Sequence, residues 1–206
     1  VQGYLCGRIL GDMGCDVIKV EPPGGDPGRM RPPFHHDTPD NERSLYWMTY
    51  NANKRGVTLD IERPEGRALF KRLVDSADFV IESFPPGHME KLGLGYWEMQ
   101  KVNPGVVMTS VTPFGQDGPY RDYKATDIVN MALSGVLYVT GDRDRPPVRV
   151  SFAQSYLHAG AEAAAASLFA HYWREATGEG QHVDVSIQES MVWTLMNVQQ
   201  AWDMSR

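Results

Sequence analysis

The side chains best suited to chemistry are spread along the chain and do not form one short motif. Lys91 and Lys124 carry ammonium groups that can donate to phosphates, and Phe84 can stack on a planar base or close a channel. Asp127 carries a carboxylate, a group that can accept a proton or a hydrogen bond. The phenol of Tyr156, with a reference pKa of about 10, is protonated at neutral pH. The alternative interpretation is two solvated surface lysines and a tyrosine that packs with one hydrogen bond.

The elements that must position these side chains follow an alternating pattern. Short apolar, β-branched runs predict strands at residues 16–20, 56–60, 78–82, 105–111 and 181–187. Helices are expected from Pro64, with an apolar stripe that ends at Val74, across the alanine-rich residues 155–173, and across 188–204, where the helix leaves the body of the domain. The Pro- and Gly-rich residues 21–42 predict an ordered surface loop. This alternation is typical of a parallel α/β layer.

Composition narrows the class of protein. The 206 residues are 42% hydrophobic, enough for a proper core and ordinarily one domain. The net charge of −6 makes nucleic acid a poor partner, although local basic groups can still hold a small anion. Two cysteines, Cys6 and Cys15, suit a reducing compartment, and no apolar run approaches the roughly 20 residues that span a bilayer. We therefore expect a cytoplasmic protein.

Several familiar templates do not match the sequence. It has no Gly-rich phosphate loop with Lys and Ser, and no G-x-G-x-x-G after a strand. The histidines and cysteines show no metal-ligand spacing beyond the adjacent pair His35 and His36. These two histidines are interpreted as surface residues of a loop, so no metal is expected. His158 follows Tyr156 closely, but a lone histidine on an alanine-rich helix is more often packed or exposed than catalytic.

A series of sequence blocks, in one order along the chain, is more specific than any single pattern. The blocks are GDMGCDVIKVE at residues 11–21, NANKR at 51–55, ADFVIESFPPG at 77–87, KLGLGY at 91–96 and FGQDGPY at 114–120. Together they resemble the class III CoA-transferase family, the formyl-CoA transferase and carnitine CoA-transferase type. The resemblance implies a Rossmann-like parallel sheet flanked by helices. Family members are about twice this long, so residues 1–206 are expected to be the amino-terminal portion of the large CoA-binding domain, with the first strand partly missing and the small domain outside.

The resemblance also implies a set of coenzyme A contacts. The matching positions are Val1, Gln2, Gly3, Leu59, Asp60, Ile61, Glu62, Ser83, Phe84, Pro85, Lys91, Lys124, Ala125, Thr126 and Asp127. Three positions depart from relatives of the formyl-CoA type: Pro22 and Glu62 stand where lysine or arginine is usual, and Ser83 replaces an asparagine. We therefore expect weaker affinity for the nucleotide end of coenzyme A.

The position of the family's nucleophile is the main departure. In the family's reaction, as the resemblance implies it, an aspartate attacks the acyl-CoA carbonyl and later carries coenzyme A as a thioester. The matching position, four residues before Gly160, is Tyr156, whose phenol is a poor substitute. Glu162 lies six residues on, about 9 Å along a helix and on another face, so it does not replace the aspartate. Asp127 is the better candidate for an auxiliary role, because the resemblance places it at a carboxylate position beside the family's active site, where it orients or protonates the reacting group.

These features favour one hypothesis and leave others open. The leading one is a subunit without the nucleophile in a heteromeric CoA-transferase acting on a carboxylic acid, resembling in outline the two-subunit benzylsuccinate CoA-transferases. The alternatives are an active homodimer that uses Asp127 or another carboxylate, and an acyl-CoA-binding protein. A racemase-like relative is disfavoured, because Thr126 stands where those enzymes have histidine. Family members form interlocked dimers, which implies a homodimer or heteromer.

Overall fold

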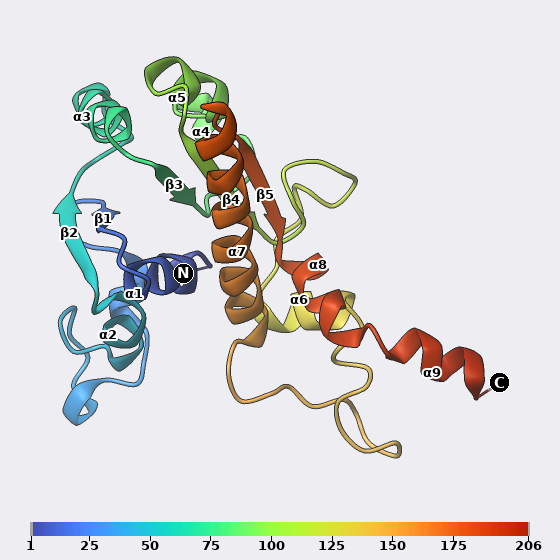
Figure 1. The fold of residues 1–206 in the computed structure, drawn as a ribbon. Helices are drawn as coiled ribbons and strands as arrows, with labels where there is room; N and C mark the ends of the chain where they lie inside the picture. Colours follow the sequence, from blue (N-terminus) through green and yellow to red (C-terminus); the bar gives the residue numbers. More distant parts are fainter. Residues whose placement is uncertain (1, 206) are drawn as a thin grey trace.

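The structure is a computed structural model that describes residues 2–205. Helices and strands alternate along most of the chain (Figure 1). In chain order the elements are α1 (Tyr4–Asp12), β1 (Val17–Glu21), η1 (Pro27–Met30), η2 (His35–Asp37), α2 (Leu45–Asn51), β2 (Lys54–Thr58), α3 (Pro64–Asp75), β3 (Phe79–Glu82), α4 (His88–Lys91), α5 (Tyr96–Val102), β4 (Val107–Thr112), α6 (Asp127–Leu133), α7 (Gln154–Thr177), β5 (His182–Ser186), α8 (Ile187–Val192), η3 (Trp193–Leu195) and α9 (Val198–Met204).

All five predicted strands are present, and they pair in parallel as the alternation predicts. They form two sheets within the described residues: β1 pairs with β2, and β4 lies between β3 and β5. Long helix α7 runs along one face of the three-stranded sheet (Figure 1). There Thr109 of β4 and Ser167 of α7 share a buried hydrogen bond of 2.7 Å. The parallel α/β class, with helices flanking the strands, is confirmed.

The close approach of α1 to α7 brings the beginning of the chain to the centre of the fold. A Cβ placed on Gly160 would lie 2.8 Å from the Leu5 Cβ, so only glycine allows the two backbones to come this near. Cys6 and Leu10 of α1 then join Ala159, Ala163 and neighbouring strand residues in one buried cluster. The small residues of the alanine-rich stretch therefore serve helix packing, and they fix the first turn of α7 beside α1.

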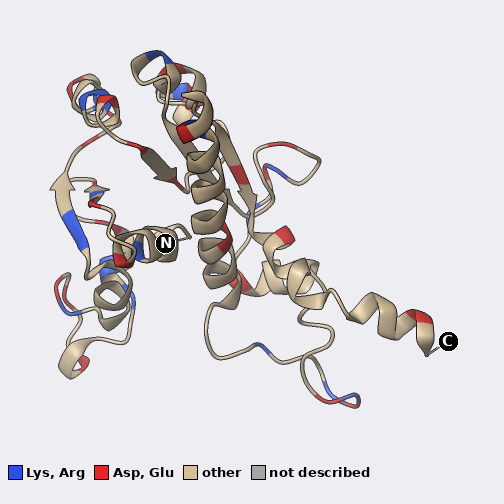
Figure 2. Cartoon of the chain, in the orientation of Figure 1, with Lys and Arg blue, Asp and Glu red and all other residues tan. Residues whose placement is uncertain are grey.

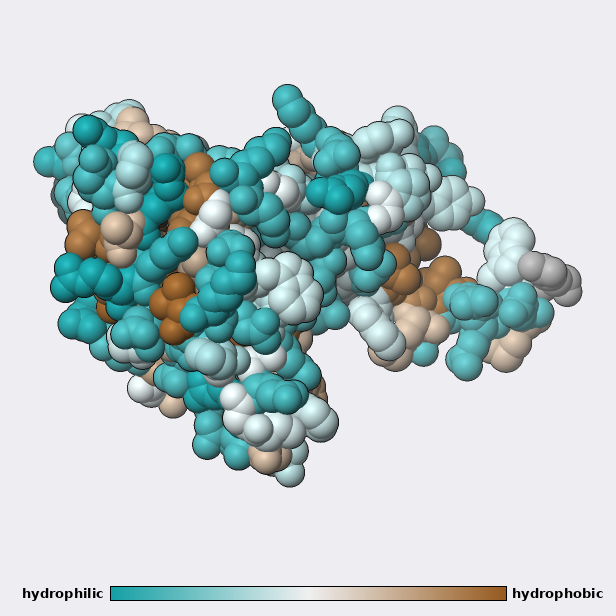
Figure 3. All heavy atoms as spheres, turned by 90° about the horizontal axis from the view of Figure 1, so that it is seen from above, coloured by the Kyte–Doolittle hydropathy of each residue, from teal (hydrophilic) through white to brown (hydrophobic). Residues whose placement is uncertain are grey.

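The end of the chain departs from the predicted single helix at 188–204. Helix α8 is followed by the turn η3 and then by α9, which extends away from the body (Figure 1). Val192, Trp193 and Thr194 are branched or aromatic, and such residues have low helix propensity where tertiary packing is sparse. Trp202 and Met204 are 63% and 83% exposed, and the space-filling view shows hydrophobic atoms beside this arm (Figure 3). No helix within residues 2–205 has the length and apolar character required to cross a membrane.

Candidate functional site

The segment after β2 is held firmly beside an open recess. The Leu59 amide donates to the Glu21 carbonyl at 2.7 Å, and the Asp60 carboxylate accepts from the Glu62 amide at 3.0 Å. Helix α3 packs onto this turn so tightly that a Cβ on Gly66 would lie 1.7 Å from the Asp60 carbonyl oxygen. A cavity of about 410 Å³ opens here, lined by Thr58, Leu59, Asp60, Arg63, Glu65, Gly66 and Leu69. Two predicted contact residues thus line a cavity at the carboxyl end of a parallel strand, where such folds bind ligands.

The turn after β3 meets the segment after β2. His88 Nε2 lies 3.1 Å from a carboxylate oxygen of Glu62, and the His88 ring stacks on Phe84 with centroids 4.8 Å apart. Phe84 is 39% exposed, so one part of its ring remains open to a ligand. The structure therefore brings the two predicted segments together, with an aromatic face between them.

A buried carboxylate shapes the turn at Phe84. Glu82 accepts a 2.7 Å hydrogen bond from the Phe84 amide and is only 8% exposed. Burial raises the pKa of Glu82 to about 7, although hydrogen bonds from Ser110 and the Phe84 amide act against that increase. Ser110 also shares a 2.9 Å hydrogen bond with His182. The sequence analysis missed Glu82. The feature that could have identified it is a carboxylate at the end of a buried strand, directly before the expected binding turn.

The remaining predicted cations lie on the surface. Lys91 and Lys124 are exposed, and neither pairs with a carboxylate of residues 2–205. Arg121, which the sequence analysis missed, reaches the turn after β3: its Nη2 would lie 3.7 Å from a Cβ on Gly87. This half-buried guanidinium also lies 3.5 Å from the Asp122 carboxylate, so it is only in part available to an anionic ligand at the β3 turn. No motif in the sequence singled it out.

The first turn of the chain lies beside the same strand. Gln2 is half-buried, and a Cβ on Gly3 would lie 3.3 Å from Ile81 of β3. Val1, also a predicted contact, is outside the described residues. The structure thus places the Gln2 turn between β3 and the close crossing of α1 with α7, near the strand whose end carries Ser83.

Asp127 joins the beginnings of two helices. It is 6% exposed and is the first residue of α6. One carboxylate oxygen accepts from the Ser155 amide at 3.0 Å and the Ser155 hydroxyl at 2.8 Å, and the other accepts from Arg149 Nε at 3.0 Å. The Ser155 amide belongs to the first turn of α7 and has no acceptor within its helix. Both oxygens are engaged, an arrangement suited to positioning the first turn of α7 and poorly suited to nucleophilic attack.

Tyr156 follows Ser155 directly and packs partly against the α1/α7 core cluster. Burial raises the pKa of its phenol, while the positive charge of Arg31 lowers it and the negative charge of Asp127 raises it further. The phenol is therefore neutral at physiological pH. His158 and Glu162 are exposed on α7, so neither forms a buried catalytic pair with Tyr156.

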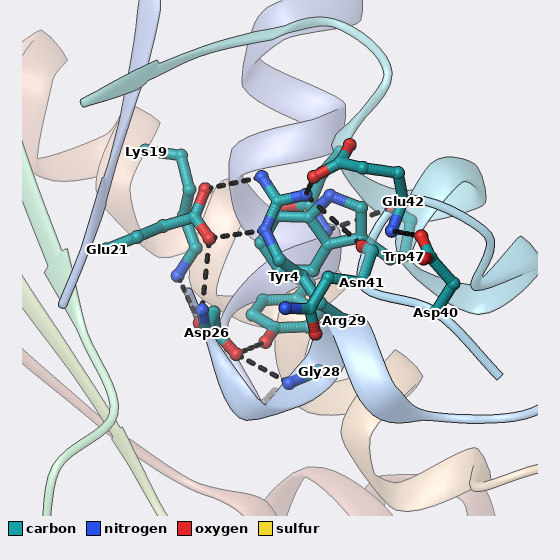
Figure 4. A network of polar contacts seen from close by, with 11 residues as sticks. Tyr4, Lys19, Glu21, Asp26, Gly28, Arg29, Asp40, Asn41, Glu42 and Trp47 are labelled. Atoms are coloured by element: carbon teal, nitrogen blue, oxygen red, sulfur yellow. Dashed lines mark hydrogen bonds and ion pairs between the residues drawn. The ribbon is translucent and has the colours of Figure 1, made fainter. Parts of the chain in front are cut away.

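The loop from Glu21 to Glu42 is ordered, as predicted, by a network of polar contacts (Figure 4). Arg29 donates to both oxygens of Glu21 at 2.7 and 2.9 Å and to Glu42 at 2.8 Å, while its guanidinium lies over the Trp47 ring at 4.3 Å. Beside it, burial acts to raise the pKa of Asp26, but Lys19 and Tyr4 together lower it to about 2. This network fixes the loop over α1 and α2.

Potential metal ligands are not gathered in one place within the described residues. Within residues 2–205 no group of three His, Cys, Asp or Glu side chains is arranged to hold a metal ion. His35 and His36 are exposed on the loop surface. Figure 2 shows Lys and Arg interspersed with Asp and Glu along the ribbon.

Comparison with known proteins shows the family to which this fold belongs. The sequence profile of CoA-transferase family III matches residues 1–205. The chain belongs to CoA-transferase family III. The resemblance drawn from the sequence blocks is thereby confirmed, while the role of position 156 is not addressed by the match.

Relatives within CoA-transferase family III include two curated proteins and a solved structure. The chain is 43% identical to a succinyl-CoA–D-citramalate CoA-transferase of Chloroflexus aurantiacus, over 93% of this chain and 47% of the relative. It is 41% identical to the succinyl-CoA:(R)-benzylsuccinate CoA-transferase subunit BbsE of Thauera aromatica, over 98% and 49%. The crystal structure of a CAIB/BAIF family protein from Brucella suis matches with a TM-score of 0.93 and 36% identity, over 100% and 54%. The chain thus spans about half the length of the curated relatives it matches.

Proposed function

We propose that this chain is the coenzyme A-binding amino-terminal part of a subunit in a heteromeric CoA-transferase. In this proposal the subunit binds acyl-CoA, and a sister subunit supplies the nucleophilic carboxylate. Coenzyme A lies across the ends of β2 and β3, where the cavity beside Leu59 and Asp60 accepts the nucleotide and Phe84 offers a stacking face. Lys91, Lys124 and Gln2 complete the expected contacts.

The proposal rests on one observation: the position of the family's nucleophile holds the neutral phenol of Tyr156, while the fold around it is that of the family. A neutral, half-buried phenol cannot form the acid anhydride that the family's carboxylate forms. The buried carboxylate of Asp127 is already hydrogen-bonded to Ser155 and Arg149. Neither side chain is therefore suited to accept an acyl group, which favours a separate source of the nucleophile over the homodimer that uses Asp127.

The names of the relatives support a substrate class. Succinate, citramalate and benzylsuccinate, the acids in those names, each carry two carboxylates. We infer that the complete enzyme moves coenzyme A between dicarboxylic acids. The BbsE relative is named as a subunit, which agrees with a heteromeric assembly for this chain too.

The reaction proposed for the assembly balances without another reactant. The sister subunit's carboxylate attacks the acyl-CoA carbonyl, a mixed anhydride forms, and the C–S bond breaks to release the thiolate of coenzyme A. The thiolate then attacks the enzyme's carbonyl and releases the first acid. The acceptor acid then attacks the enzyme thioester, which forms a second anhydride and releases the thiolate. The thiolate attacks the acceptor's carbonyl in that anhydride, which gives the new acyl-CoA and frees the enzyme carboxylate. This chain contributes binding and orientation of coenzyme A.

The test compares the full-length protein alone with the protein co-purified with a family member that has Asp at the position matching Tyr156. We expect transfer from succinyl-CoA to a second dicarboxylic acid only in the mixture. The Tyr156→Phe variant should keep transfer in the mixture within about twofold, because the phenol takes no covalent part. Replacing the sister's aspartate by alanine should abolish it.

Two results would contradict the proposal. One is transfer by the full-length protein alone at a normal enzymatic rate, unchanged in Tyr156→Phe. The other is trapping by hydroxylamine of an acylated carboxylate on this chain during turnover, which would support the homodimer that uses Asp127 or another carboxylate.

A further inference from the structure

A serine hydroxyl lies between two titratable side chains of the three-stranded sheet. Ser110 of β4 is 1% exposed and is the register partner of Glu82 on β3. On its other side, the Ser110 Oγ lies 2.9 Å from Nε2 of His182, a residue of β5 that pairs with Met108. Because neighbouring residues of paired strands point to the same face, the three side chains form one row across β3, β4 and β5 (Figure 1).

This row lies on the face of the sheet that α4 and α5 cover. Thr109, between Met108 and Ser110, points to the opposite face and hydrogen-bonds to α7. Met108 packs in one buried cluster with Met89 of α4. Since Ser110 is almost completely buried, a substrate cannot reach its hydroxyl. The contact with His182 is therefore not that of a catalytic nucleophile with its base.

The Glu82 end of the row reaches the turn that follows β3. The Glu82 carboxylate is 8% exposed and accepts a hydrogen bond of 2.7 Å from the Phe84 amide. An ionised carboxylate accepts a stronger hydrogen bond than a neutral carboxylic acid. The charge of Glu82 therefore decides how firmly the turn at Phe84 is held.

Titratable groups of three elements face this row. Burial raises the pKa of Glu82 to about 7 and lowers the pKa of His182. The negative charges of Glu90 on α4 and Asp184 on β5 act to raise both pKa values. Tyr96 of α5 stacks on the His182 ring, with centroids 5.5 Å apart. Near neutral pH Glu82 thus changes its charge, while His182 is an uncharged imidazole.

The single proton of the Ser110 hydroxyl sets the direction of every hydrogen bond in the row. Ionised Glu82 accepts that proton's hydrogen bond, and the Ser110 oxygen then accepts from the Nε2–H of His182. Protonated Glu82 can instead donate to Ser110, which donates to a bare Nε2. When Glu82 ionises, its proton passes to Ser110, the Ser110 proton passes to Nε2, and the ring releases its Nδ1 proton to water. One proton leaves the protein in total.

We propose that Ser110 and His182 are positioning residues for coenzyme A, because they donate in series toward ionised Glu82 and so stabilise the form that holds the turn at Phe84. The relay depends only on the contacts of these three side chains. That the positioned ligand is coenzyme A rests on the proposed function. Neither Ser110 nor His182 lies in a predicted contact segment, so the relay extends the binding turn across the sheet.

The experiment follows the ionisation of Glu82 in the full-length protein by infrared difference spectroscopy from pH 5 to pH 9. The carbonyl band of the protonated acid is assigned by its loss in Glu82→Gln. Ser110→Ala and His182→Leu should each raise the midpoint of ionisation by about half a pH unit or more, because the carboxylate loses a donor or the support of that donor. The matched control is His158→Leu, an exposed histidine on α7, which should not move the midpoint.

A conservative variant and a double variant separate a relay from independent contacts. The amide of His182→Gln can donate in place of Nε2–H and does not titrate, so the midpoint should stay within about 0.3 pH unit of wild type. Because His182 acts through Ser110, the double variant Ser110→Ala/His182→Leu should shift the midpoint no further than Ser110→Ala alone. Calorimetry near pH 7.5 should show about a threefold or greater loss of coenzyme A affinity in Ser110→Ala and His182→Leu, and wild-type affinity in His182→Gln.

The outcomes that overturn the proposal are distinct. An unchanged midpoint in both single variants, or shifts that add in the double variant, overturns the relay. Wild-type coenzyme A affinity in variants whose midpoint has moved overturns the positioning role. If Ser110→Ala does not fold, the exposed residue His182 carries the same test through His182→Leu and its rescue by His182→Gln. Failure of CoA transfer in the two-subunit mixture, with midpoints and coenzyme A affinities as expected, would overturn only the proposed function.

Discussion

The Asp127 carboxylate accepts hydrogen bonds from both the backbone amide and the hydroxyl of Ser155, at 3.0 and 2.8 Å. This contact ties the beginning of α6 to the first turn of α7, 28 residues later in the chain. It also sets the orientation of the residue that follows, Tyr156. The negative charge of a carboxylate at this position complements the backbone amides at a helix N-terminus, which have no acceptor within the helix.

Asp127→Asn should destabilise the protein by about 1–2 kcal/mol. The variant leaves Arg149 without a counter-ion and weakens the hydrogen bonds to Ser155, but Arg149 is 44% exposed, so solvent screens part of the loss. Urea unfolding at neutral pH measures the change. The matched control is Asp144→Asn, an exposed residue without an ion pair in residues 2–205, which should stay within about 0.5 kcal/mol. Equal effects of the two substitutions would show that Asp127 has no special positioning role.

The stability of the fold should fall as pH rises through the range in which Glu82 ionises. The folded-state pKa of Glu82 is raised to about 7, above its ordinary value of 4.5, so the folded state binds more protons than the unfolded state between these values. The cost of burying the charge therefore appears above pH 4.5 and is complete above pH 7. Over that range it amounts to about 3 kcal/mol.

Glu82→Gln isolates this contribution, because glutamine can still accept from the Phe84 amide and does not ionise. Urea unfolding at pH 5 and pH 8 should show a smaller loss of stability in the variant than in the wild type. Glu162→Gln, at an exposed position on α7, should behave as wild type. Parallel pH dependences in wild type and Glu82→Gln would contradict the assignment.

The sequence predicted the elements better than the contacts between them. Strand positions follow from local apolar runs, and both ends of β1 and of β5 lie within one residue of the predicted boundaries. The separation into two sheets depends on pairing between distant segments, which no local pattern encodes. The helix breaks after α8, where helix propensity is low and tertiary packing is sparse. Neither property can be read from hydrophobic periodicity.

Of the candidate site, only the residues that the family resemblance indicated could be predicted from the sequence. Leu59 and Asp60 follow β2 and Phe84 follows β3, each at the carboxyl end of a parallel strand, where such folds bind ligands. The two strands belong to different sheets, and the contact between Glu62 and His88 brings the two segments together. Arg121 was not predictable, since its importance comes from the approach of its loop to Gly87 in space. Single charged residues in loops carry no periodicity or motif that distinguishes them from solvated surface groups.

Gly66→Ala should damage both the fold and the nucleotide cavity. A methyl group there would overlap the Asp60 carbonyl oxygen at 1.7 Å, and that oxygen is backbone, so α3 or the Leu59–Asp60 segment must shift. We expect a loss of about 3 kcal/mol or more and at least a tenfold loss of coenzyme A affinity. Gly56→Ala is the control, because its new methyl would meet only Glu21, at 3.7 Å. Unfolding and calorimetry measure the two effects, and wild-type coenzyme A affinity in a folded Gly66→Ala variant would place the nucleotide elsewhere.

Glu62→Lys should strengthen coenzyme A binding. Glu62 stands on the segment next to Phe84 and pairs with His88 at 3.1 Å, and its side chain is 61% exposed, so removal of this pair costs little stability. Reversal of the charge replaces repulsion of the coenzyme A phosphates by attraction, and we expect about a five- to tenfold gain at low ionic strength that shrinks as salt is added. Glu162→Lys changes the net charge equally on α7 and should give no comparable gain. Titration calorimetry at two salt concentrations measures both variants, and an equal or weaker affinity in Glu62→Lys would move the phosphates away from the junction of the β2 and β3 loops.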